Sequence, residues 1–134
     1  MKKTRQVGIA IIWNREHSQV LIDQRLPQGD FGSYWEFPGG KIEPHESVTA
    51  CIKREIKEEL GIDLEVDDHL LTLKYEYEHL HLTLIAHHAH MTNPDQPVQA
   101  IACQQVKWVK PSNLINYQFP AANYKIIDTL VQNT

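Results

Sequence analysis

Glutamates clustered in one predicted helix are the strongest chemical signal in the sequence. Glu55, Glu58 and Glu59 are spaced at i, i+3 and i+4, so a helix brings their carboxylates together. Like charges this close raise one another's pKa values, and near a helix C-terminus they also oppose the helix dipole. A divalent cation removes both costs, and Mg²⁺ is usually held by one or two carboxylates plus substrate phosphates. The spacing therefore favours a metal site.

The helix that must carry these glutamates is predicted over Ser47–Leu60. Ser47 is a suitable N-cap, and Gly61 is suited to the left-handed position that ends a helix. On a helical wheel the buried stripe is formed by Val48, Ile52, Ile56 and Leu60. Glu59 then falls at the edge of the stripe, and all three glutamates are expected away from the solvent face.

The segment KREIKEEL also has an ordinary interpretation. Charged residues on a helix more often form a solvated face with ion pairs at i,i+4, and Arg54 and Glu58 have that spacing. The glutamates alone do not decide between this face and a metal site.

A longer pattern surrounds the glutamates. Gly40 is followed at fixed spacings by Glu46, Arg54-Glu55, Glu58-Glu59 and Gly61, with aliphatic Ile56 and Ile62 between and after them. This pattern resembles the Nudix box at every fixed position. The resemblance implies an α+β Nudix fold, with a mixed sheet sandwiched between helices. It also implies metal-dependent hydrolysis of a nucleoside diphosphate linked to another group.

The resemblance assigns roles residue by residue. The implied ligands of Mg²⁺, or of Mn²⁺ in its place, are the Gly39 carbonyl, Glu55, Glu58 and Glu59. The implied catalytic residues are Arg54, Glu55 and Glu58, with Arg54 orienting a glutamate through a charge-assisted hydrogen bond. Glu46 would brace the loop before the helix. Gly39 and Gly40 would let the backbone approach the metal and the phosphates.

Two segments outside the box extend the resemblance. WEFPGGKIE (35–43) and QFPAANYKII (118–127) resemble the MutT branch of the family, and KYEYEHLHLTL (74–84) does so more loosely. Enzymes of this branch hydrolyse 8-oxo-dGTP to 8-oxo-dGMP and pyrophosphate. The implied substrate-binding residues are Arg25, Glu36, Phe37, Pro38, Gly39 and Asn123. Arg5 and Val7 are placed where the first strand could border the nucleoside.

Asn123 is the residue that the resemblance assigns to reading the base. An amide offers both a hydrogen-bond acceptor and donors, and oxidation of guanine at C8 turns N7 from an acceptor into a donor. The alternative is a solvent-facing N-cap of the last helix. Phe37 has core packing as its alternative role, and Arg25 has that of a surface arginine at a strand end.

One feature departs from the MutT pattern. Relatives usually carry a glutamate in the loop before the strand that contains Trp108. Here that position is Ala102, and no acid occurs between Gln96 and Trp108. The loop therefore supplies neither a general base nor an extra metal ligand. Either Glu55 takes the base role, or the metal alone activates the water.

Two other functions are compatible with the residues. One is a Nudix pyrophosphohydrolase for another nucleoside triphosphate, such as a pyrimidine triphosphate, because specificity pockets change easily on one fold. The other is a non-catalytic Nudix module that binds a nucleotide. Such a module would be expected to lose glutamates of the box, whereas this chain retains all of them.

The remaining elements are predicted from hydrophobic patterning and from turn residues. Two hairpins are expected, followed by a further strand, a short helical turn and a C-terminal helix whose apolar face is Tyr124, Ile127, Leu130 and Val131. The segments, in chain order, are Val7–Trp13, Val20–Gln24, a short extended piece Tyr34–Phe37, Leu70–Tyr77, His79–Met91, Val106–Val109, Pro111–Leu114 and Ala121–Val131.

Size and composition limit the class of protein. The chain has 134 residues and a net charge of −4 with histidine neutral, which predicts a single domain (1–134) and argues against binding of long nucleic acid. No apolar run approaches the roughly 18 residues of a membrane span, and no signal peptide is visible. We expect a cytoplasmic monomer with two reduced cysteines that acts on a small nucleotide.

Histidines are frequent between residues 79 and 90. His79, His81, His87, His88 and His90 all lie in this segment. Histidine is a common zinc ligand, but no cysteine or carboxylate at suitable spacing completes a zinc site here. A polar face of a sheet is the preferred interpretation, because antiparallel strands commonly keep one face wet.

Overall fold

A seven-stranded mixed sheet forms the centre of the computed structural model, which describes residues 2–133. The strands are β1 (Lys3–Trp13), β2 (Val20–Gln24), β3 (Trp35–Glu36), β4 (Gly39–Lys41), β5 (Leu64–Tyr77), β6 (Leu80–Met91) and β7 (Gln105–Val109). The main order is β3-β2-β1-β6-β5, with β4 paired to β1 and β7 paired to β2. Strands β1 and β6 are parallel, and the other pairs are antiparallel.

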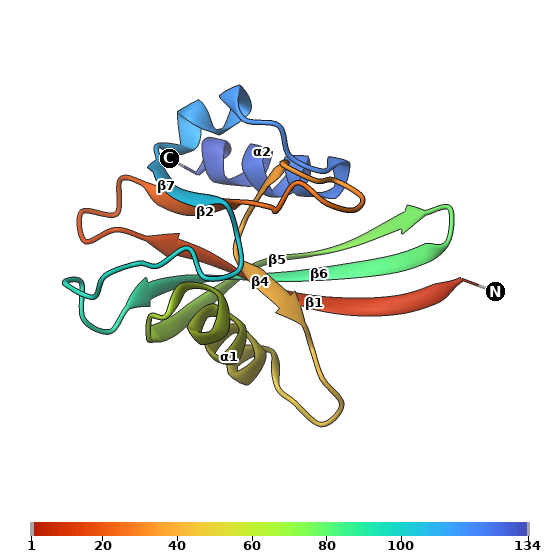
Figure 1. The fold of residues 1–134 in the computed structure, drawn as a ribbon, viewed down its shortest axis with the longest axis horizontal. Helices are drawn as coiled ribbons and strands as arrows, with labels where there is room; N and C mark the ends of the chain where they lie inside the picture. The colour runs from red at the N-terminus through yellow and green to blue at the C-terminus, as the bar shows by residue number, and fades with distance from the viewer. Residues whose placement is uncertain (1, 134) are drawn as a thin grey trace.

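Helices cover both faces of the sheet (Figure 1). Helix α1 (Val48–Leu60) lies on one side, and helix α2 (Tyr124–Gln132) lies on the other with the 3₁₀ turns η1 (Pro111–Asn116) and η2 (Ala121–Asn123). Strand β1 serves both layers because its side chains alternate between the faces. Ile9 and Ile11 pack toward α2, whereas Ala10 and Ile12 pack toward α1. This architecture confirms the expected α+β fold with a mixed sheet between helices.

Helix α1 has the boundaries that its capping residues predict. The Ser47 hydroxyl accepts a hydrogen bond from the Ala50 N–H at 3.0 Å, and Gly61 has φ 69° and donates its N–H to the Lys57 carbonyl. Its buried residues are Cys51, Ile52, Ile56 and Leu60. The expected stripe is therefore buried except at its first turn, where Val48 is only half-buried. Within residues 2–133, no helix is both long and apolar enough to span a membrane.

Both hairpins form, but two strands begin earlier than patterning predicts. Strand β1 starts at Lys3 and β5 starts at Leu64, because each pairs along β6 for most of its length. The extension of β1 is polar and exposed, and that of β5 is mostly polar apart from buried Leu64 and half-buried Val66, so hydrophobic patterning did not mark them.

The predicted apolar face of the C-terminal helix is partly wrong. Its buried residues are Ile126, Ile127 and Leu130, whereas Tyr124 and Val131 are 39% and 43% exposed. The 3₁₀ turn η2 occupies Ala121–Asn123, so the α-helical part begins at Tyr124. The face that packs on the sheet therefore differs from the expected one by part of a turn.

Replacing the cap of α1 should lower stability without a change of fold. In Ser47→Ala the Ala50 N–H loses its acceptor, and we expect a loss of about 1 kcal/mol in the free energy of unfolding, the usual cost of a lost N-cap. Ser47→Asp restores an acceptor and should recover most of it. Urea denaturation measures both values, and equal stability of Ser47→Ala and the wild type would contradict the role of the cap.

Candidate functional site

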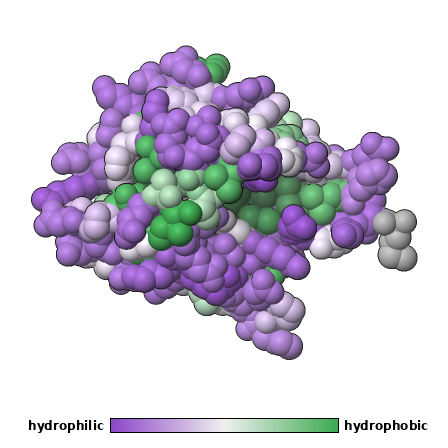
Figure 2. Space-filling model, in the orientation of Figure 1, coloured by the Kyte–Doolittle hydropathy of each residue, from purple (hydrophilic) through white to green (hydrophobic). Residues whose placement is uncertain are grey.

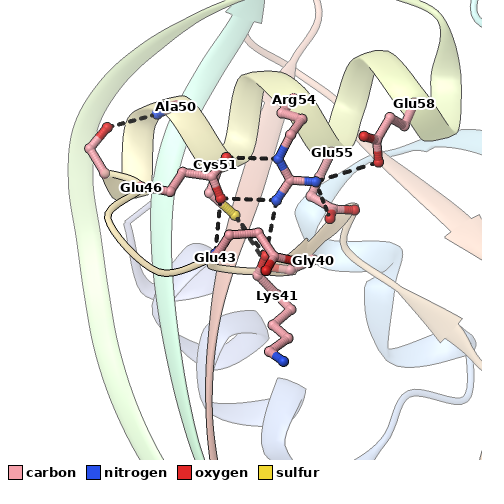
Figure 3. A network of polar contacts seen from close by, with 10 residues as sticks. Gly40, Lys41, Glu43, Glu46, Ala50, Cys51, Arg54, Glu55 and Glu58 are labelled. Atoms are coloured by element: carbon pink, nitrogen blue, oxygen red, sulfur yellow. Dashed lines mark hydrogen bonds and ion pairs between the residues drawn. The ribbon is translucent and has the colours of Figure 1, made fainter.

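Arg54 on α1 connects the loop before the helix to the glutamates of the helix (Figure 3). Its guanidinium donates to both oxygens of Glu46, from Nε at 2.7 Å and from Nη2 at 2.9 Å. Nη1 donates to Glu55 at 2.8 Å and reaches Glu58 at 3.5 Å, while Nη2 also donates to the Lys41 carbonyl at 3.1 Å. Such a planar fork fixes the orientation of its carboxylate partners.

The carboxylate of Glu46 also accepts a hydrogen bond from the Glu43 N–H at 3.0 Å. The hydrogen bonds from Arg54, and then this backbone contact, lower the pKa of Glu46 to about 2. Glu46 therefore stays charged and ties the loop to α1. These hydrogen bonds are the contacts that Glu46 needs if it braces the loop before α1.

Glu58 lies differently from the wheel-based expectation. Its side chain is 60% exposed, compared with 17% for Glu55. The expectation that all three glutamates avoid the solvent face is therefore wrong for Glu58. Glu58 makes the i,i+4 ion pair with Arg54 that the alternative interpretation named, so the helix combines an ion-paired edge with a buried carboxylate.

Gly40 on β4 provides the space that Glu55 occupies. A Cβ atom at this position would collide with the carboxyl group of Glu55, including Oε2. At Gly39 a Cβ would collide with the Gly8 carbonyl, because β4 pairs closely with β1. The two glycines thus let the backbone of β4 pass between β1 and the glutamates of α1.

Glu59 is the buried carboxylate of the site. Its Oε2 atom is inaccessible to solvent and has no hydrogen-bond partner among the described residues. Burial is the largest cause that raises the pKa of Glu59 to about 8, followed by the charges of Glu36 and Glu55, while the Gly39 backbone lowers it. An unpartnered buried carboxylate is costly, so this atom calls for a cation or a proton.

The donor set fits a hard divalent cation. It consists of carboxylate oxygens from one rigid helix and the backbone of Gly39, and one buried oxygen among them has no partner. Over residues 2–133, no group of three or more His, Cys, Asp or Glu side chains is arranged to hold a metal ion. Mg²⁺ does not require one, because it keeps several waters and shares its site with substrate phosphates.

A pocket of about 840 Å³ lies next to these groups. Its lining runs from Glu36 and Gly39 at the carboxylate end to Pro120, Ala122 and Asn123 below α2. Apolar side chains of β1 and β6 form its wall: Val7, Ile9, Leu82 and Leu84. Figure 2 shows hydrophobic residues gathered along a hollow across the middle of one face, with hydrophilic surface on either side.

The structure brings most of the expected substrate-binding residues to this pocket. Arg25, Glu36, Phe37, Gly39 and Asn123 line it, as do Arg5 and Val7. Pro38 does not; it is buried, and its carbonyl accepts the Ala10 N–H at 2.9 Å.

Three of these residues had alternative interpretations. Arg25 donates to Glu36 at 3.0 Å, so it is an ion-paired residue at the rim of the pocket. Phe37 is 3% exposed and packs on Phe119 with the ring centroids 5.2 Å apart, so it serves the core as well as the pocket. Asn123 is 8% exposed and its side chain makes no capping hydrogen bond, so a solvent-facing N-cap is the wrong description.

Sequence reasoning missed several residues of the site. Asp23 on β2 is 3% exposed and has an unpartnered Oδ2 atom. Its only sequence signal is one acid inside an apolar strand. Phe31 and Tyr77 approach each other over the pocket, with ring centroids 5.9 Å apart. Phe31 comes from the loop between β2 and β3 and Tyr77 from the end of β5, so no spacing in the sequence connects them.

The histidines of residues 79–90 lie on β6 and in the turn before it, where His79 lines the pocket. His81 contacts Glu76 at 2.7 Å and His90 contacts Asp67 at 2.7 Å. His88 is half-buried and accepts the Trp13 indole N–H at 2.9 Å. Burial is the main cause that lowers the pKa of His88, which keeps this acceptor neutral.

Comparison with known proteins gives the family. A sequence model described as the NUDIX domain matches residues 8–129. The chain belongs to the Nudix hydrolase family. This finding confirms the resemblance of the glutamate-rich box, and the relatives confirm its extension to the MutT branch.

Relatives cover nearly the whole Nudix chain. An 8-oxo-dGTP diphosphatase of Haemophilus influenzae is 34% identical over 135 residues, with 99% of this chain and 96% of the relative covered. A CTP pyrophosphohydrolase of Escherichia coli is 30% identical over 127 residues, with 92% and 89% covered. The solution structure of the E. coli ORF135 protein has a TM-score of 0.82 at 30% identity, with 98% and 91% covered.

The buried carboxylate of this Nudix domain should make the metal-free protein less stable as pH rises. Glu59 has a folded pKa of about 8 against an ordinary value of 4.5, so between these values the unfolded state has lost a proton that the folded state still holds. The free energy of unfolding therefore falls from about pH 4.5 to about pH 8. Glu59→Gln removes this contribution, and we expect a gain of about 1–3 kcal/mol at pH 8 and almost none at pH 4.5.

Thermal denaturation in EDTA at the two pH values measures this difference. Glu65→Gln, at an exposed position on β5, is the matched control and should change stability little at either pH. A gain in Glu59→Gln that is equal at both pH values would contradict the burial argument.

Proposed function

We propose that this Nudix pyrophosphohydrolase hydrolyses 8-oxo-dGTP to 8-oxo-dGMP and pyrophosphate with Mg²⁺, thereby clearing an oxidised nucleotide from the cytoplasmic pool. The observation that carries the proposal is one pocket with two distinct ends. Asn123, buried and without a capping contact, lines one end, while Gly39 and Glu36 line the end next to the glutamates of α1. A base and a triphosphate need these two environments at once.

The base end suits an oxidised purine. An amide can donate to O6 and accept from the N7–H that oxidation at C8 creates. Ordinary guanine presents N7 as an acceptor instead, which leaves the amide oxygen unpaired. Because an unpaired buried polar group is costly, Asn123 would discriminate between the two bases. Arg5 and the apolar residues of β1 border the same pocket.

The carboxylate end suits phosphoryl transfer. The Gly39 carbonyl, Glu55, Glu58 and Glu59 would hold the Mg²⁺, which would neutralise charge on the phosphates and lower the pKa of a bound water. Arg54 holds Oε1 of Glu55 at 2.8 Å, while Oε2 lies over Gly40. In this proposal Glu55 Oε2 would accept the proton of the attacking water, and the contact with Arg54 supports this role by fixing the carboxylate. Arg25, at the rim of the pocket, would contact a phosphate.

Pyrophosphate release tests the proposal. The purified protein with Mg²⁺ is assayed against 8-oxo-dGTP, dGTP, CTP and dCTP, and we expect the largest kcat/KM with 8-oxo-dGTP. Glu59→Gln should lose more than about 100-fold in kcat, since it removes a ligand of the charge-neutralising cation. Absence of turnover with every nucleotide would contradict the enzyme and favour a binding module.

A pyrimidine triphosphate is the second candidate substrate. The observation in its favour is the E. coli relative named CTP pyrophosphohydrolase, which covers 92% of this chain. A kcat/KM for CTP above that for 8-oxo-dGTP in the same assay would select this candidate.

Removing the amide of Asn123 should reduce discrimination between bases. In Asn123→Ala we expect the ratio of kcat/KM for 8-oxo-dGTP over dGTP to fall about tenfold or more, because a lost polar contact in a buried site costs about 1–3 kcal/mol. Asn116→Ala, at an exposed position in η1, is the control and should keep the wild-type ratio. An unchanged ratio in Asn123→Ala would contradict the proposal that Asn123 recognises the base.

A further inference from the structure

Asp23 is an acid in the buried part of the sheet. Its neighbours on β2, Val20, Leu21 and Ile22, are all 0% exposed, and Asp23 itself is 3% exposed. Its Oδ2 atom is inaccessible and has no hydrogen-bond partner among the described residues. Burial is the main cause that raises the pKa of Asp23 well above its usual value. A strand does not need such a residue for packing, so this carboxyl group calls either for a proton shared with Glu36 or for a bound cation.

The groups that face Asp23 are mostly acids. Glu36 is directly opposite it on β3, and Glu59 on α1 is near enough for its charge to act on Asp23. Arg25, whose charge acts on Asp23 in the opposite sense, is itself paired with Glu36 at 3.0 Å. Glu59 also carries an unpartnered buried oxygen. Two elements that are distant in sequence, β2 and α1, thus each carry a buried carboxylate with an unpartnered oxygen, and their charges are close enough to interact.

The loop that lacks an acid passes through this same region. The Ile101 N–H donates to the Glu59 carbonyl at 3.0 Å, and the Gln104 N–H donates to the Gln24 carbonyl at 2.8 Å. Ala102 therefore lies on a short segment held between the end of α1 and the end of β2. The next residue, Cys103, is close enough to Asp23 for that charge, after burial, to raise the pKa of its thiol.

We propose that Asp23 is an additional carboxylate ligand for the divalent cation at the Glu59 end of the site, and that β2 thereby supplies the acid that the 99–104 loop lacks. This assignment rests on the metal site of the proposed function. Its basis is a side chain more than nine-tenths buried that has an unpartnered oxygen, lies opposite Glu36 on β3 and is near enough to Glu59 for the two charges to interact. A pair of carboxylates from two rigid elements, completed by water and phosphate, is a common arrangement for Mg²⁺.

The competing role is purely structural. Asp23 could serve as a neutral acid that shares a hydrogen bond with Glu36. Asn has the same shape and retains a donor for Glu36, so Asp23→Asn would preserve that role and remove only the charged oxygen. Cation affinity therefore separates the two roles, whereas loss of activity would not.

Mn²⁺ binding to the full-length, nucleotide-free protein tests the assignment. Free Mn²⁺ is measured by electron paramagnetic resonance during titration of the wild type and three variants: Asp23→Asn, Glu59→Gln and, as an exposed control on α2, Asp128→Asn. We expect Asp23→Asn to weaken binding about fivefold or more, a typical effect of altering a metal site, and Asp128→Asn to change nothing. Unchanged affinity in Asp23→Asn, with Glu59→Gln weakened, would overturn the role of Asp23 and leave the proposed metal site intact.

Two further measurements keep the outcomes distinct. If the wild type takes up no Mn²⁺, or if Glu59→Gln binds it as well as the wild type does, the metal site of the proposed function fails.

Rescue uses the double variant Asp23→Asn/Ala102→Glu, in which the loop supplies the acid instead. Recovery of Mn²⁺ affinity in it supports the assignment, because a structural hydrogen bond to Glu36 would not be restored from Ala102. The rise in melting temperature caused by Mn²⁺ should rank the variants in the same order as their Mn²⁺ affinities.

Discussion

The ion-pair network of Arg54 is the interaction on which the rest of the site depends. One guanidinium holds Glu46 by two hydrogen bonds and Glu55 by another, so it neutralises part of the acidic cluster and joins the loop to the helix. Glu55 is fixed over Gly40. The remaining negative charge is concentrated at the buried carboxylate of Glu59. The network thus compensates part of the charge of Glu55 and Glu58 and leaves the buried Oε2 atom of Glu59 without a partner.

The close passage of β4 past β1 connects this acidic cluster to the pocket. Gly39 pairs with Ile9 on β1, lines the pocket and also contacts Glu59 through its backbone. The core below α2 ends in the same pocket at Asn123. The pocket therefore has Gly39, which contacts Glu59 of α1, at one end and the buried amide of Asn123 at the other, with apolar walls from β1 and β6. That division suits a ligand with one apolar ring system and one polyanionic tail.

Asp23 extends the same physical principle to a second element. Burial, together with the charges of Glu36, Glu55 and Glu58, raises the pKa of Glu59 to about 8, and the charge of Glu59 in turn contributes to the raised pKa of Asp23. Proteins tolerate such strain mainly at functional sites. The absence of an acid between Gln96 and Trp108 and the presence of one in β2 are therefore best treated as a single feature, because Asp23 and the loop are neighbours in the fold.

Local patterns in the sequence were sufficient for helix α1, for both hairpins and for the spacing of the glutamates, because caps, turns and periodicity act between residues close in the chain. They also placed the Nudix box and the segment that contains Asn123. The exposure of Glu58, the burial of Asn123 and the true packing face of α2 were decided by tertiary structure. Each depends on how a helix rotates against a sheet, and that rotation is set by contacts from distant segments. Asp23 illustrates the limit most clearly: in the sequence it is one acid in a strand, and only the meeting of β2, β3 and α1 makes it a neighbour of Glu36 and Glu59.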